Sequence, residues 1–165
     1  FGNQFNIARK VTGHELPPVY VYALETSLQL TLTELNESLR EVYLEAYRQP
    51  QSADYIYRHT ASELYQIFGS YLPSYSECDF YEQDIGSSGI MHAYMERPCD
   101  LYFTLEKKLS RFLTMSMRAY CVPPDEQQQV LAFIETLDIR GISERVMQEL
   151  FRKLEMQFSF SLGTS

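Results

Sequence analysis

The chain has 165 residues, and its 14 Lys and Arg against 22 Asp and Glu give a formal net charge of −8. Its length favours one domain with a substantial core, and its 45% hydrophobic residues exclude disorder as the dominant state. The acidic balance excludes nucleic-acid binding through a general positive surface. We expect no membrane span, which needs about 20 apolar residues, and no signal peptide, because no basic segment leads into an apolar one.

The spacing of apolar side chains in steps of three and four residues predicts an all-helical fold, a multi-helix bundle without strands or internal repeats. Proline, glycine and capping residues mark the expected helix ends. The expected helices span residues 3–11, 17–50, 52–68, 77–96, 100–121, 123–137 and 139–160.

Two serines are expected to begin helices. Ser52 would cap the helix over 52–68, and Ser76 would cap the helix over 77–96, with Asp79 three residues later. Gly86 and Gly89 lie inside that second helix, where each costs about 1 kcal/mol relative to Ala. Either a neighbouring helix or a ligand approaches closely there, or the helix is kinked or broken.

The last expected helix carries two apolar stripes, where the edge helix of a monomer needs only one. The first stripe is Ile139, Ile142, Val146 and Leu150, and the second is Met147, Phe151, Leu154 and Phe158. Two stripes indicate burial on two sides, which favours a subunit interface. The alternative is a helix at the centre of a monomeric bundle.

The three cysteines, Cys78, Cys99 and Cys121, are an odd number and have no CxxC spacing. This pattern favours reduced thiols over a disulfide or zinc framework, and so predicts a cytoplasmic protein. A buried or inert thiol is the expected state of each.

Motifs for catalysis are lacking: the sequence has no GxSxG, Walker, GxGxxG or HExxH pattern. We therefore expect a protein that is not an enzyme and holds no cofactor or metal. Two HxxxE spacings, His59–Glu63 and His92–Glu96, each put an imidazole and a carboxylate on one helix face. Side by side they could supply four metal ligands, but we favour ordinary i,i+4 pairs.

Aromatic and sulfur side chains at helical spacing could line a ligand pocket, because pockets are mostly apolar with a few polar groups. The candidate ligand-binding residues are Tyr43, Tyr47, Tyr55, His59, Met91, His92, Met95 and Phe112. The alternative is that the same stripes are plain core.

The layout resembles the regulatory part of TetR/AcrR-family transcriptional regulators. Phe1-Gly2-Asn3-Gln4 is similar to the aromatic turn that ends the family's helix-turn-helix. Further similarity lies in GIMHAY and PCDLY, and in LDIRGI and VMQELF of the closing helix; these segments are residues 89–94, 98–102, 137–142 and 146–151.

The resemblance implies that residues 1–12 are the tail of an N-terminal helix-turn-helix domain with its connecting helix, and that residues 13–165 form a C-terminal ligand-binding and dimerisation domain. The recognition helix would lie before Phe1. Gln4 stands where the family commonly has a lysine that contacts DNA phosphate, and it keeps a hydrogen-bond donor without the charge.

The resemblance also implies a homodimer, a binding site for an unidentified small-molecule effector, and release of operator DNA when that molecule binds. Dimers of this family pair two helices of each subunit in a four-helix interface. The residues expected there are Leu109, Leu113, Met147, Phe151, Leu154 and Phe158. Two alternatives remain: a helical-bundle metalloprotein or enzyme using His59, Glu63, His92 and Glu96, and a helical interaction domain without a ligand.

Overall fold

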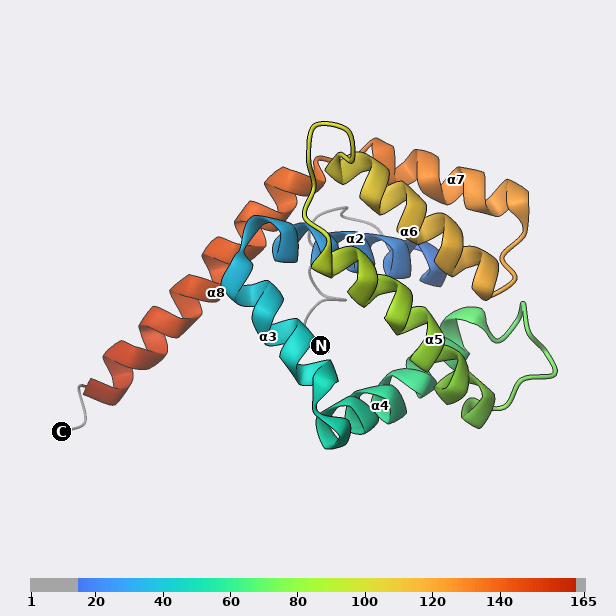
Figure 1. Ribbon diagram of the computed structural model, residues 1–165, viewed down its shortest axis with the longest axis horizontal. Helices are drawn as coiled ribbons and strands as arrows, with labels where there is room; N and C mark the ends of the chain where they lie inside the picture. The colour runs from blue at the N-terminus through green and yellow to red at the C-terminus, as the bar shows by residue number, and fades with distance from the viewer. Residues whose placement is uncertain (1–14, 163–165) are drawn as a thin grey trace.

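A computed structural model describes the backbone of residues 15–162 and the side chains of residues 15–155. Within that part the chain forms seven α-helices and no strand, which confirms the all-helical prediction (Figure 1). The helices are α2 (Pro18–Leu35), α3 (Glu37–Arg48), α4 (Pro50–Phe68), α5 (Glu77–Glu96), α6 (Leu105–Ala119), α7 (Pro124–Glu135) and α8 (Ile139–Leu162). The expected helix over 3–11 and Gln4 lie outside the described residues, as does the side chain of Phe158.

Helix α2 is the central helix, because it packs against each of the other six described helices. Its sequence explains this position: between Pro17 and Thr33 it carries a single charged residue, Glu25. Its buried hydroxyls bond to carbonyls one turn back, for example Thr31 Oγ1 to the Ser27 oxygen at 2.7 Å. A helix that is largely apolar on all sides is stable only inside the bundle.

The single helix expected over 17–50 is wrong, because the chain forms two helices that meet at Asn36. Asn36 adopts an extended backbone conformation, and its side chain accepts a hydrogen bond from the Leu39 amide at 2.9 Å. The residue therefore caps α3 as a new helix. Helix α3 leaves the line of α2 at this point and leads to α4 (Figure 1).

The ends of α4 and α5 agree with the sequence in part. Helix α4 begins at Pro50, two residues before the expected Ser52 cap, and the Ser52 hydroxyl bonds instead to the Ala46 oxygen at 2.5 Å. Helix α5 begins with the expected capping box: Ser76 accepts from the Asp79 amide at 3.3 Å, and Asp79 accepts from the Ser76 amide at 2.7 Å.

Helix α5 continues without interruption through Gly86 and Gly89. A Cβ atom at either glycine would meet nothing within 4 Å, so no helix or loop of the described chain approaches closely there. Of the two alternatives, a break in the helix is therefore absent, and close packing by the described chain does not explain the glycines.

Helix α6 begins at Leu105 and not at residue 100 as expected. Asp100 instead accepts hydrogen bonds from the backbone amides of Tyr102 (2.8 Å) and Phe103 (2.6 Å), which closes a turn. Thr104 then caps α6 by accepting from the Lys107 amide at 3.3 Å. Competition from the Asp100 side chain accounts for the later start.

Helix α8 packs against α2 along its first half, and its second half extends away from the bundle (Figure 1). Ile139 and Ile142 of its first apolar stripe are buried in the core. The three cysteines are unpaired thiols. No helix in the described part of the chain has the length and hydropathy to cross a membrane.

Candidate functional site

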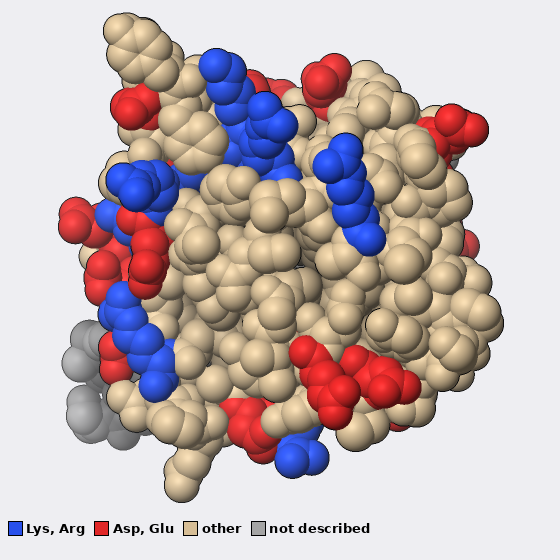
Figure 2. Space-filling model, turned by 45° about the vertical axis from the view of Figure 1, so that its right-hand side comes forward, with Lys and Arg blue, Asp and Glu red and all other residues tan. Residues whose placement is uncertain are grey.

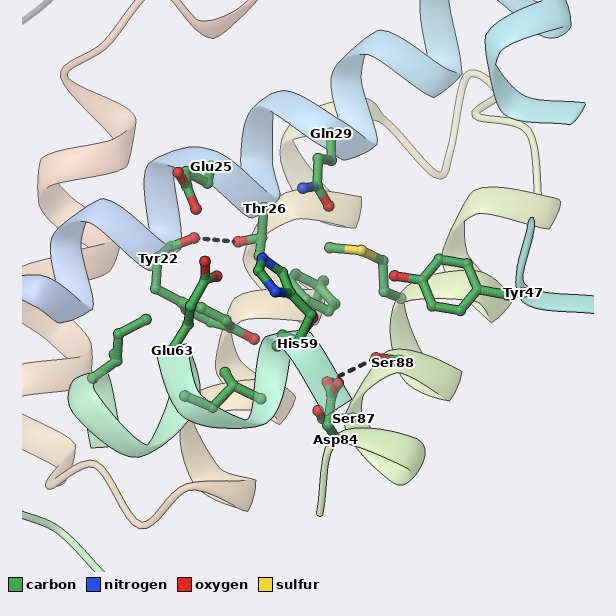
Figure 3. A pocket seen from close by; sticks show the side chains of 15 residues that line it. Tyr22, Glu25, Thr26, Gln29, Tyr47, His59, Glu63, Asp84, Ser87 and Ser88 are labelled. Atoms are coloured by element: carbon green, nitrogen blue, oxygen red, sulfur yellow. Dashed lines mark hydrogen bonds between the residues drawn. The ribbon is translucent and has the colours of Figure 1, made fainter. Parts of the chain in front are cut away.

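A cavity of about 100 Å³ lies between α2, α4 and α5, with single residues from α3 and α6 completing its wall (Figure 3). Side chains from five helices therefore meet around it. The lining residues are Tyr22, Glu25, Thr26, Gln29, Tyr47, His59, Thr60, Glu63, Leu64, Ile67, Asp84, Ser87, Ser88, Met91 and Phe112.

Asp84 is the most buried carboxyl group of the cavity wall, with 5% of its surface exposed. Its Oδ1 accepts a hydrogen bond from Ser88 Oγ at 2.9 Å, whereas Oδ2 is buried and has no hydrogen-bond partner among the described residues. Burial disfavours the charged form and raises the pKa of Asp84 to about 6, although the nearby hydroxyl groups of Ser88 and Ser87 act against this. Most Asp84 side chains are therefore still ionised at pH 7.

Glu25 reaches the cavity from the central helix. Burial, and then the neighbouring charge of Glu63, raise the pKa of Glu25 to about 8. Its Oε1 atom is buried and has no hydrogen-bond partner in the part of the chain that the structure describes. Glu25 is thus mostly protonated at pH 7, and a positive charge beside it would favour its ionised form.

The phenols that face the cavity are neutral. Burial raises the pKa of Tyr22, whose hydroxyl is hydrogen-bonded to Ser116 Oγ. Burial, and then the charge of Asp84, raise the pKa of Tyr47. Ser87 is also engaged, because its Oγ lies 2.7 Å from the hydroxyl of the buried Tyr120. Among the described residues of the wall, the buried polar atoms that lack a hydrogen-bond partner are therefore carboxyl oxygens, Glu25 Oε1 and Asp84 Oδ2.

Four of the eight residues named as ligand-binding candidates line this cavity: Tyr47, His59, Met91 and Phe112. His59 is exposed at the surface and also lines the cavity, so it lies at the mouth. Whether these residues bind a ligand stays a prediction.

The other four candidates lie outside the lining. Tyr55 is 72% exposed and stacks parallel to the His59 ring, 6.3 Å from it. Met95 is a core residue and Tyr43 packs against the core from α3. His92 lies behind the wall, with its ring 3.9 Å from that of Tyr47, and burial lowers its pKa.

Sequence reasoning missed the two carboxyl groups with unpaired oxygens, Glu25 and Asp84. A signal existed for Glu25, because it is the only charged residue in an apolar and hydroxyl-rich stretch of 17 residues, from Pro17 to Thr33. Ser87 and Ser88, between the two glycines of α5, are small residues that leave room for a cavity. Asp84 lies among other polar residues, and nothing local in the sequence distinguishes it.

The four-ligand metal site considered from sequence is not assembled. Residues 15–155 hold no group of three or more His, Cys, Asp or Glu side chains placed to bind a metal ion. His92 instead contacts Tyr47, and Glu96 pairs with Arg48 at 3.2 Å. The two HxxxE pairs therefore do not share a site.

The residues expected at a dimer interface fall into two groups. Leu109 and Leu113 are buried in the chain's own core, so the expectation that they face a partner needs correction: they are on the inner face of α6. Met147 is half-buried and accepts a hydrogen bond from Asn36. Phe151 and Leu154, by contrast, are 54% and 52% exposed on the projecting part of α8.

The charged side chains are distributed without a continuous basic surface on the face drawn in Figure 2. There most Lys and Arg lie toward the upper and left margins, others lie at the lower edge and right of the upper centre, and Asp and Glu are mixed among them around a broad uncharged centre. This distribution agrees with the net charge of −8.

Comparison with family models, with curated proteins and with solved structures finds no match to this chain.

Proposed function

We propose that this chain is the ligand-binding and dimerisation domain of a TetR-like transcriptional repressor. A small molecule would bind in the cavity and cause release of operator DNA. The observation that carries this proposal is the cavity itself, because five helices of the bundle converge on it and leave buried polar atoms unpaired there. Concave sites that combine apolar side chains with polar groups able to orient a ligand are typical of small-molecule binding.

The position of the cavity against α2 supports a sensing role. Glu25, Thr26 and Gln29 of α2 contribute to the wall, and α2 packs against all the other described helices. A ligand that binds between α2, α4 and α5 would therefore favour one relative position of these helices. Such a ligand shifts an equilibrium by the difference between its affinities for the two arrangements.

The exposed apolar side chains of α8 support self-association. Leu150, Phe151 and Leu154 each expose about half of their surface on the part of α8 that extends from the bundle. A second copy of the same face would cover them around a two-fold axis. In a homodimer, a ligand-dependent change within each subunit also changes the spacing of two DNA-reading domains, which must meet successive major grooves.

Native mass spectrometry of the purified chain tests the dimer and the ligand together. We expect a homodimer, and an organic adduct where the effector is retained through purification. The variant Ser88→Phe would fill the cavity from α5, so it should lose the adduct and remain dimeric. Ser38→Phe, on the exposed surface of α3, is the matched control and should keep both. A monomer carrying stoichiometric metal would contradict the proposal.

The DNA-binding part is tested separately. The reading frame upstream of the codon for Phe1 should encode a helix-turn-helix, and the longer protein should bind DNA from its own promoter region in a gel-shift assay. Absence of both would leave a helical bundle that senses a ligand without regulating transcription.

A further inference from the structure

The cavity wall is acidic. Three of its residues are carboxylic acids, Glu25 from α2, Glu63 from α4 and Asp84 from α5, and the described lining contains no Lys or Arg. Figure 3 shows Glu25 and Glu63 on one side of the His59 ring and Asp84 on the other. A ligand inside the cavity therefore meets carboxyl groups from three helices and no fixed positive charge from Lys or Arg.

Asp84 is the carboxyl group of the wall that most clearly lacks a hydrogen-bond donor. Asp84 exposes only 5% of its surface. Among the described residues, only one of its two carboxyl oxygens has a hydrogen-bond partner. A buried carboxylate oxygen without a donor is costly, because it has lost water and gained nothing in return. An N–H group on a bound ligand would supply the missing donor, and a positive charge on that group would strengthen the bond.

Glu25 repeats the pattern from the opposite wall. Its Oε1 is buried and unpartnered as well, and it lies close enough to Glu63 for their charges to interact. Two residues that line the cavity from different helices thus each carry a buried carboxyl oxygen without a donor among the described residues. Hydrogen bonds within the described protein satisfy neither of them.

The rest of the wall combines hydroxyl, amide and imidazole side chains with an apolar and aromatic part. Leu64, Ile67, Met91 and Phe112 line the cavity together with the ring of Tyr47. Aromatic faces attract organic cations as well as apolar groups. The volume of about 100 Å³ is smaller than the about 150 Å³ of a cavity that accommodates benzene. A one-ring molecule would therefore fill the cavity and extend through its mouth at the exposed His59.

We propose that the cavity selects a small organic cation, an amine with an aromatic or branched apolar part, with Asp84 and Glu25 as its counter-ions. This inference rests on the proposed sensing function and names the chemical class of the effector. The ammonium group donates to the free oxygens of the two carboxyl groups, and the apolar part lies against Met91 and Phe112. Neutral and anionic molecules of the same shape lack the positive charge that these oxygens require.

Isothermal titration of the dimeric chain at pH 8 with three probes of matched shape tests the preference. The probes are phenethylamine, 2-phenylethanol and 3-phenylpropionate. We expect the amine to bind at least about tenfold more tightly than the alcohol, and the carboxylate to bind least. This comparison uses the unaltered protein and does not depend on the folding of any variant.

The variant Asp84→Asn removes the charge with little change of shape. It should weaken phenethylamine binding by about tenfold and leave 2-phenylethanol binding unchanged. Glu82→Gln is the matched control, since Glu82 is exposed on the same helix and its replacement changes the net charge equally. It should bind all three probes as the unaltered chain does, and thermal unfolding checks that both variants are folded.

Three results would overturn the inference. The amine could fail to bind, the alcohol or carboxylate could bind as tightly as the amine, or Asp84→Asn could bind the amine unchanged. The proposed regulator function fails by other readouts, namely a monomeric chain and the lack of promoter binding by the longer protein. A dimer that binds the neutral probe would therefore refute the cation preference alone.

Discussion

Lys108 Nζ lies 2.8 Å from Glu34 Oε2 in an ion pair that joins α6 to the C-terminal end of the central helix α2. Lys108 is 1% exposed and also donates to the backbone oxygen of Arg97 at 2.5 Å. Glu34 Oε1 accepts from the Cys99 amide at 2.8 Å. The pair thus ties the loop between α5 and α6 to the core. Burial acts to raise the pKa of Glu34, but the bonds from Lys108 and Cys99 outweigh it and hold that pKa below its ordinary value.

Replacing Lys108 by Met should lower the free energy of unfolding by about 3 kcal/mol, because the partly buried Glu34 carboxylate is left without its partner. Lys107→Met on the same helix is the control, and this exposed site should change stability by less than about 0.5 kcal/mol. Urea unfolding measures both. If the loss comes from leaving the Glu34 carboxylate unpaired, the double variant Lys108→Met and Glu34→Leu should recover much of the lost stability. A Lys108→Met variant as stable as the unaltered chain would contradict the prediction.

Asn36 is expected to determine where α2 ends and α3 begins. The variant Asn36→Ala loses the acceptor for the Leu39 amide and should cost about 1 kcal/mol of unfolding free energy. Asn36→Asp keeps an acceptor at the same place and should cost little. A stability of Asn36→Ala equal to that of the unaltered chain, measured by thermal unfolding, would show that packing alone sets the break.

Glu25 should make the empty protein less stable as the pH rises. Its pKa is about 8 in the folded chain, against an ordinary value of 4.5. Between these values the folded chain holds a proton that the unfolded chain has released, so this contribution is fully present below pH 4.5 and is lost as the pH rises through about 8.

Glu25→Gln cannot titrate, so its unfolding free energy should rise relative to that of the unaltered chain between about pH 5 and pH 8. The other groups that face the site, His59, Glu63, Asp84 and the phenols of Tyr22 and Tyr47, are present in both proteins. Exposed Glu82→Gln is the control and should follow the unaltered chain. Parallel stability curves for Glu25→Gln and the unaltered chain would refute the raised pKa.

The projecting face of α8 is expected to hold the dimer together. The double variant Phe151→Glu and Leu154→Glu places charges at the centre of that face and should yield monomers in analytical ultracentrifugation. Gln148→Glu adds charge at an exposed polar position of the same helix and should remain dimeric. A double variant that sediments as a dimer would place the interface elsewhere.

Much of the helix layout follows from short-range signals in the sequence. The Ser76–Asp79 capping box depends on residues three apart, and it begins α5 at the expected residue. Pro50 and Pro124 similarly stand at the first turns of α4 and α7, where a missing amide hydrogen does little harm. The departures are also local but involve competition: the side chains of Asn36 and Asp100 bond to nearby amides and exclude helix at those points.

The candidate site was decided by tertiary structure. Tyr47, His59, Met91 and Phe112 were identified from sequence because aromatic, imidazole and sulfur side chains suit a pocket, but nothing in their spacing separated them from Tyr55 and Met95. Position on a helix face depends on 3.6-residue periodicity, which sequence reveals. Which faces of α2, α4 and α5 enclose a space, and which carboxyl oxygens then lose both water and partners, depends on how distant segments pack. Sequence by itself therefore determined the all-helical class and several helix ends, and packing decided that Glu25 and Asp84 line one cavity.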